Sequence, residues 1–125
     1  MDKNLLRQKY LEQHDGLVDD YLDIIVDIYE KFPDFKTDLD FLFRSQVSSD
    51  FALMIKNNLN DIEKTHKALE FIKQLYDRPQ DKWDAVSEDF ACALKNMLNN
   101  NEVNIKSLNK VIQEDIHQIF DKEGF

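Results

Sequence analysis

The chain has 125 residues, of which 42% are hydrophobic and 33% are charged, so it carries enough apolar material for the core of one domain. It contains only two glycines and two prolines, which excludes glycine-rich phosphate-binding loops and disfavours turn-rich β-sandwiches and β-barrels. The net charge of −9 argues against direct binding to nucleic-acid phosphates or to an anionic membrane.

Apolar residues recur at spacings of three and four in the first part of the chain, which predicts helices. The first helix is predicted over residues 3–14 and the second over residues 17–31, with a change of phase between them. Pro33 ends the second helix, because proline disfavours α geometry in the residue before it. The apolar positions from residue 39 to residue 47 predict a short third helix.

The same pattern continues to the end of the chain. The longest helix is predicted over residues 51–76, with the serine and aspartate side chains of residues 48–50 as its N-terminal cap. Two further helices are predicted over residues 83–98 and 104–122, and Gly124 suits a C-terminal cap. We therefore expect a single all-α domain over residues 1–125, a compact helical bundle of four main helices with one or two short ones.

The cysteine content and the first residues indicate the compartment. Cys92 is the single cysteine, whereas small secreted domains usually carry several disulfide-bonded cysteines. The N-terminal residues lack the cationic start and apolar run of a signal peptide, and no uncharged stretch is long enough for a membrane span. The sequence therefore predicts a soluble, cytoplasmic protein without a membrane partner.

The surplus negative charge is concentrated between residues 12 and 40, which contain ten acidic residues and two lysines. On a helical wheel the acidic residues of the second helix fall in one stripe, without a lysine or arginine between them. Each like-charge pair at such spacing costs an isolated helix about 0.2–0.5 kcal/mol. A surface selected only for stability would gain from an interrupting lysine, so one interpretation of the stripe is a docking surface for a cationic partner. The alternative is a solvated face that supplies solubility.

Phenylalanines follow the stripe closely and are interleaved with aspartates, a composition that resembles an interface hot spot. Phe35 stands in a turn outside any helical register, so we expect it to be the most exposed of them. The alternative is that these rings close the end of the core, where phenylalanine is usually found. The predicted partner-binding residues are Asp19, Asp20, Asp23, Asp27, Glu30, Asp34, Phe35 and Asp38.

Two Glu-x-x-His pairs resemble the ligand spacing of carboxylate-bridged metal bundles. The pairs are Glu63 with His66 and Glu114 with His117. His66 falls on the apolar face of its helix, whereas Glu114 and His117 fall on the polar face of theirs. The two pairs are therefore not expected to converge. We predict no metal ligands and no cofactor, and interpret His66 as a hydrogen-bonded core histidine.

Nothing in the sequence predicts a catalytic site. Cys92 lies in a strongly apolar helix without a neighbouring base or cation that would activate its thiol. The leading hypothesis is therefore a non-enzymatic acidic interaction protein. Its partner would be a basic protein or the basic patch of a nucleic-acid-binding protein, which it could inhibit in the manner of an immunity protein or a nucleic-acid mimic.

Two other functions stay open. Ile24 and Val26 widen the apolar stripe of the second helix beyond what one neighbour would cover, which favours a structural module that forms a homodimer or a subunit of a larger assembly. The third possibility is a carboxylate–histidine metal-binding bundle.

Overall fold

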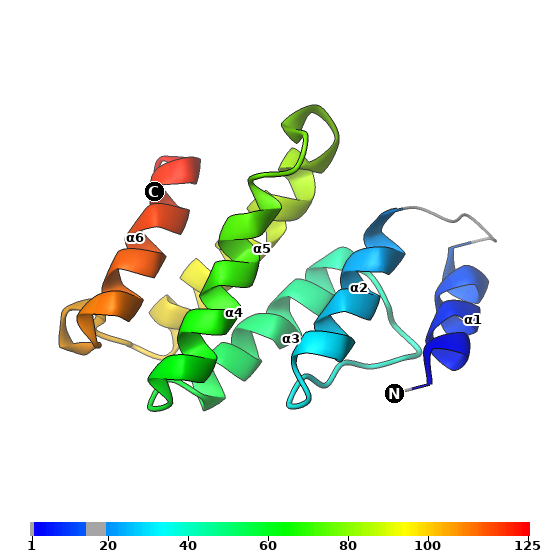
Figure 1. Cartoon of the computed structure of the whole chain (residues 1–125), viewed down its shortest axis with the longest axis horizontal. Helices are drawn as coiled ribbons and strands as arrows, with labels where there is room; N and C mark the ends of the chain where they lie inside the picture. The colour runs from blue at the N-terminus through cyan, green and yellow to red at the C-terminus, as the bar shows by residue number, and fades with distance from the viewer. Residues whose placement is uncertain (1, 15–19) are drawn as a thin grey trace.

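The computed structural model describes residues 2–14 and 20–125, and the regular secondary structure of these residues is entirely helical. In chain order the elements are α1 (Lys3–Gln13), α2 (Asp20–Lys31), α3 (Arg44–Asn57), α4 (Ile62–Leu75), α5 (Gln80–Asn100), the short 3-10 helix η1 (Ile105–Ser107) and α6 (Lys110–Glu123) (Figure 1). The prediction of an all-α chain is confirmed. The helix count differs, because the described residues form six α-helices of at least eleven residues each.

The predicted helix over residues 51–76 is wrong, since it is two helices, α3 and α4. At the break, the Asn58 side chain donates to the Met54 carbonyl at 2.9 Å, and the Asp61 carboxylate accepts from the Lys64 backbone N–H at 3.1 Å. The Thr65 hydroxyl donates to the Asn58 carbonyl at 2.5 Å. Such local side-chain bonds compete with the helical ladder, so the chain turns here although the apolar spacing continues.

The short helix predicted over residues 39–47 is also wrong, because α3 begins at Arg44 and the preceding residues form an irregular connection. The connection is fixed to the end of α1. The Leu42 N–H donates to the Gln13 side chain at 2.5 Å, and the His14 ring forms a 2.9 Å hydrogen bond with the Leu42 carbonyl. The predicted cap at residues 48–50 therefore lies inside α3, where the Ser48 hydroxyl donates to the Ser45 carbonyl at 3.1 Å.

Two other helix starts differ from the prediction. Pro79 is the N-cap of α5, which therefore begins three residues before the predicted start. Asn109 caps α6 by accepting from the Val111 N–H, so α6 begins six residues after the predicted start at residue 104. Three of the intervening residues form η1. The predicted cap at Gly124 is confirmed, since this residue has a left-handed φ of 71° that glycine adopts without strain.

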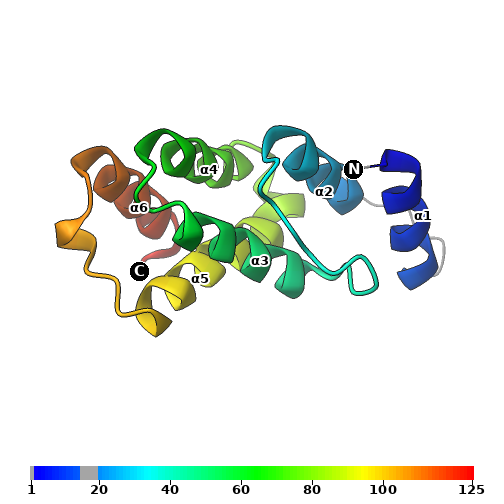
Figure 2. The same ribbon diagram turned by 90° about the horizontal axis from the view of Figure 1, so that it is seen from below.

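The helices lie in two rows. Figure 2 shows α2 and α4 in one row and α3 and α5 in the other, with α1 and α6 at the two ends of the molecule. The packing contacts follow this order, since α3 contacts α5, α4 contacts both α5 and α6, and α1 contacts α2. In the part of the chain that the structure describes, no helix has the length and apolar character required to cross a bilayer.

An aromatic cluster joins the two rows. Phe51 of α3 is fully buried, and its ring centroid lies 5.3 Å from that of Phe32, 5.4 Å from that of Phe71 and 5.5 Å from that of Phe90. Phe35 adds a fourth ring at 6.2 Å. Because these residues come from the end of α2, from α4, from α5 and from the connection, one side chain holds four segments together.

We expect Phe51→Ala to lower the free energy of unfolding by about 3–5 kcal/mol, because the cavity would face four aromatic rings that cannot all collapse into it. Urea denaturation followed by circular dichroism measures the loss. Phe41→Ala is the control, since the Phe41 side chain is 48% exposed and its loss should cost less than about 1 kcal/mol. Equal losses in the two variants would contradict the central position of Phe51.

Candidate functional site

The acidic face consists of Asp23, Asp27 and Glu30 on α2, and of Asp34 and Asp38 in the connection that follows it. Asp23, Glu30, Asp34 and Asp38 are exposed and Asp27 is half-buried, so all five carboxylates reach the surface. Asp19, predicted to belong to this set, lies outside the described residues, as does the side chain of Asp20.

The prediction that no cation interrupts this row is wrong. Lys3 of α1 forms an ion pair with Glu30, and Lys64 of α4 forms one with Asp34 at 3.0 Å. Arg78, from the turn between α4 and α5, lies 3.9 Å from Asp27. All three cations come from other elements, so a helical wheel of α2 alone cannot show them.

Two of these ion pairs are open to solvent, whereas the side chains of Arg78 and Asp27 are 35% and 37% exposed. The side chains of Lys3 and Glu30 are 63% and 44% exposed, and those of Lys64 and Asp34 are 57% and 53% exposed. Exposed pairs contribute little to stability, because water screens the charges and ordering two long side chains costs entropy. Glu30 and Asp34 can therefore exchange these cations for those of a partner with little loss of folding stability. Arg78 beside Asp27, by contrast, also packs on the Trp83 ring, 4.8 Å from its centroid.

The predicted exposure of Phe35 is also wrong, because this side chain is 3% exposed. After Pro33 the chain turns back, with the Phe35 N–H donating to the Phe32 carbonyl at 3.1 Å. The turn directs the ring into the core, 5.1 Å from the Tyr29 ring in an edge-on contact. Phe35 is therefore part of the core and cannot serve as an exposed anchor.

Two other phenylalanines of the connection lie at the surface instead. Phe41 and Phe43 are 48% and 38% exposed, and their ring centroids are 4.7 Å apart. Leu42 between them is fully buried, so the extended chain turns its two neighbours outward. The Phe41 N–H donates to the Asp38 carbonyl at 3.0 Å, which places this aromatic pair beside the acidic face. Exposure therefore alternates along Phe41, Leu42 and Phe43, as is typical of an extended segment. The prediction of a helix over these residues missed this pattern.

The wide apolar stripe of α2 is covered within the chain. Ile24 is fully buried, and Val26 packs against the core as a half-buried side chain. Both side chains are therefore covered within the chain, so they do not form the wide exposed apolar stripe from which a homodimer through this face was predicted.

A charged cluster connects α4 to α6. The Asp115 carboxylate is buried and contacts His66 Nδ1 at 2.5 Å and Lys73 Nζ at 2.8 Å. Lys73 also pairs with Glu70. Partial burial acts to lower the pKa of Lys73, but its hydrogen bonds with Asp115 and Glu70 outweigh this effect and hold the pKa above its usual value.

Three side chains of this cluster are possible metal ligands. His66, Glu70 and Asp115 each offer a ligand atom, and these atoms lie within 4.8 Å of one another. The Lys73 ammonium, however, already bonds both carboxylates, so the cluster has its own cation. Glu63, Glu114 and His117 are exposed, and the two Glu-x-x-His pairs do not converge.

The Cys92 thiol is not activated as a nucleophile. Burial, followed by the nearby carboxylates of Glu88 and Glu123, raises its pKa above the usual value. The thiol is therefore protonated at neutral pH, whereas a reactive cysteine requires the thiolate.

No protein-family model matches the chain, and neither the curated proteins nor the solved structures contain a significant match to it.

We expect Asp115→Asn to lower the free energy of unfolding by about 2 kcal/mol, because it leaves the partly buried Lys73 ammonium without its buried counter-charge. Chemical denaturation at pH 7 measures the change. The matched control is Asp121→Asn on the exposed side of α6, which should have little effect. A loss at Asp115 no larger than that of the control would contradict a structural role for the cluster.

Alkylation of Cys92 by iodoacetamide at pH 8 should be slower than that of a cysteine in a short unstructured peptide, because the raised pKa reduces the thiolate fraction. Glu88→Gln removes one carboxylate that raises this pKa and should accelerate the reaction. Glu114→Gln, distant on α6, should not change it. A wild-type rate equal to that of the peptide thiol would contradict the raised pKa.

Proposed function

We propose that this protein is a non-enzymatic, acidic interaction protein that binds a basic protein surface. The observation that carries the proposal is the set of five surface carboxylates of the acidic face, which end at an exposed aromatic pair. The partner class follows from charge complementarity, since aligned carboxylates attract a lysine- and arginine-rich surface and repel acidic ones.

Phe41 and Phe43 supply the apolar part of such an interface. Aromatic rings at the surface are the usual anchors of protein–protein contacts, and a polar or charged rim around them excludes water from the contact. The carboxylates of Asp38 and Asp40 form part of this rim, because both residues belong to the same turn: the Asp40 N–H donates to the Asp38 carboxylate at 2.9 Å. Lys9 pairs with Asp40 in an exposed contact that a partner cation can replace.

A basic surface that normally holds nucleic acid is the partner class we favour. Carboxylates along a helix can occupy the lysine and arginine side chains that otherwise contact phosphates, and such binding needs no catalytic group. The protein would then act as a competitive inhibitor.

Self-association is the second candidate, and the same aromatic pair supports it. Two copies could bury Phe41 and Phe43 against each other, whereas the acidic faces would repel. Light scattering separates the two functions, because a strict monomer at micromolar concentration disfavours self-association.

The test uses a fluorescein-labelled, lysine-rich peptide as the probe and fluorescence anisotropy at low ionic strength as the readout. The triple variant Asp23→Asn, Asp27→Asn, Glu30→Gln should weaken binding by about tenfold and flatten its dependence on salt. The matched control Glu63→Gln, Glu102→Gln, Glu114→Gln changes the net charge equally at exposed positions elsewhere, and should weaken binding by less than about threefold. Equal losses in the two variants would show that only net charge matters and would overturn the proposed face.

A further inference from the structure

A pocket of about 300 Å³ lies between the end of α2, the end of α3 and the start of α4. Two features of the sequence create it. Pro33 stops α2, and the hydrogen-bonded break at residues 58–61 turns the chain between α3 and α4. A continuous helix through this break, as the apolar spacing alone predicts, would have left no such hollow.

The pocket has an apolar lining. Phe32, Met54, Ile55 and Ala68 line it, and each is buried against the core. Ala68 provides only a methyl group where a larger side chain would fill the space. Met54 is flexible and polarizable, so it can adapt to the shape of a bound apolar group.

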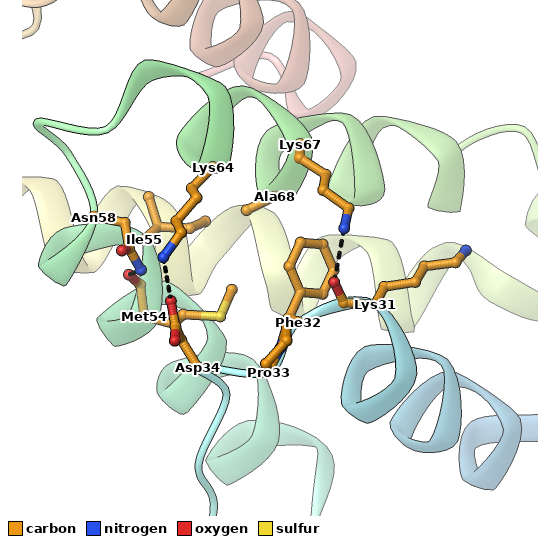
Figure 3. A pocket seen from close by; sticks show the side chains of 10 residues that line it. All are labelled: Lys31, Phe32, Pro33, Asp34, Met54, Ile55, Asn58, Lys64, Lys67 and Ala68. Atoms are coloured by element: carbon orange, nitrogen blue, oxygen red, sulfur yellow. Dashed lines mark hydrogen bonds and ion pairs between the residues drawn. The ribbon is translucent and has the colours of Figure 1, made fainter.

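The charged residues around this lining are mainly cationic. Lys31, Lys64 and Lys67 line the pocket together with one acidic residue, Asp34. This local excess of positive charge stands out in a chain with 25 acidic and 16 basic residues. Figure 3 shows Lys64 and Lys67 reaching from α4 toward Asp34 on one side and the Phe32 ring on the other.

The present partners of these lysines leave them available to a ligand. Lys64 pairs with Asp34 in a contact that is more than half exposed. The Lys67 ammonium donates to the Lys31 carbonyl at 2.8 Å and lies 5.2 Å from the centroid of the Phe32 ring. Each ammonium has three N–H donors, so Lys67, whose contacts are a carbonyl and an aromatic ring, can bind an anion without giving up these contacts.

We propose that this pocket binds a small apolar carboxylate of the medium-chain fatty-acid type. The alkyl chain lies on Phe32, Met54 and Ala68, and the carboxylate accepts a hydrogen bond from Lys67, on the Phe32 side of the pocket (Figure 3). The volume is at the lower end of the range for small-molecule sites, which suits a ligand of this size and excludes a large cofactor. A single negative charge suits the site, because Asp34 already pairs with Lys64 and the Lys31 ammonium points away from the pocket (Figure 3). This site is separate from the proposed protein-binding function and shares only Asp34 with the acidic face.

The probe is sodium decanoate, used below its micelle-forming concentration, and the neutral comparison is decanamide. The protein is labelled with ¹³C at its methionine methyl groups, and the Met54 signal is assigned with Met54→Leu. We expect decanoate to shift the Met54 methyl signal saturably and to leave that of Met97, which lies outside the pocket lining, unchanged. Decanamide should bind about tenfold more weakly, because it lacks the charge-assisted hydrogen bond to Lys67.

The double variant Lys64→Gln, Lys67→Gln should weaken decanoate binding by about tenfold or more. Its control is Lys106→Gln, Lys110→Gln, which removes two exposed lysines near the start of α6 and should leave binding unchanged. Thermal melts establish that both variants are folded. Equal affinity for decanoate and decanamide, equal losses in the two double variants, or a shift of Met97 without Met54 would each overturn the proposal.

Discussion

The packing of Phe51 against four other aromatic rings is the interaction on which the described surfaces depend. Phe51 contacts Phe32 and Phe35 on either side of Pro33, so it fixes the turn that ends α2. This turn directs Asp34 outward and Phe32 toward the pocket. Phe51 also contacts Phe71 and Phe90, which fixes the turn against α4 and α5. The positions of the acidic face and of the lysine-lined pocket therefore both depend on the same aromatic core.

Helical periodicity predicted the fold class and the central part of five of the six described α-helices, because burial of an apolar face is a local property of the sequence. The exception is α3, whose centre was predicted as a cap at residues 48–50. The periodicity failed at residues 58–61, since Leu59 and Ile62 continue the apolar spacing while Asn58 and Asp61 form the hydrogen bonds that end one helix and cap the next. It failed again before Arg44, where contacts with Gln13 and His14, distant in sequence, hold an extended segment. The apolar spacing alone reveals neither contact. The first was signalled by the asparagines and the aspartate of residues 57–61, which are typical turn and N-cap residues, whereas the second depends on residues distant in sequence.

The candidate site also combines features that the sequence predicted with features that it could not predict. The sequence predicted which carboxylates reach the surface, because they lie opposite the apolar face of α2. It could not predict their partners, since Lys3, Lys64 and Arg78 belong to other helices and turns. Folding thus places the surplus acid beside cations and reduces the local field without burying the charges. Folding also buries Phe35, the expected anchor, and exposes Phe41 and Phe43. The apolar part of the proposed interface therefore differs from the prediction, whereas the exposed aspartates near it remain.

The central claim is that the Phe51 cluster makes α2, α3, α4 and α5 one cooperative unit. Native-state amide hydrogen exchange tests it most directly, because it reports the free energy of opening for each helix separately. The account predicts that the amides of Ile25, Ile55, Ile72 and Leu94, one in each helix, exchange only through global unfolding and so share a single free energy of opening. Markedly faster exchange at Ile25 than at the other three would show that α2 opens alone, and would contradict the claim.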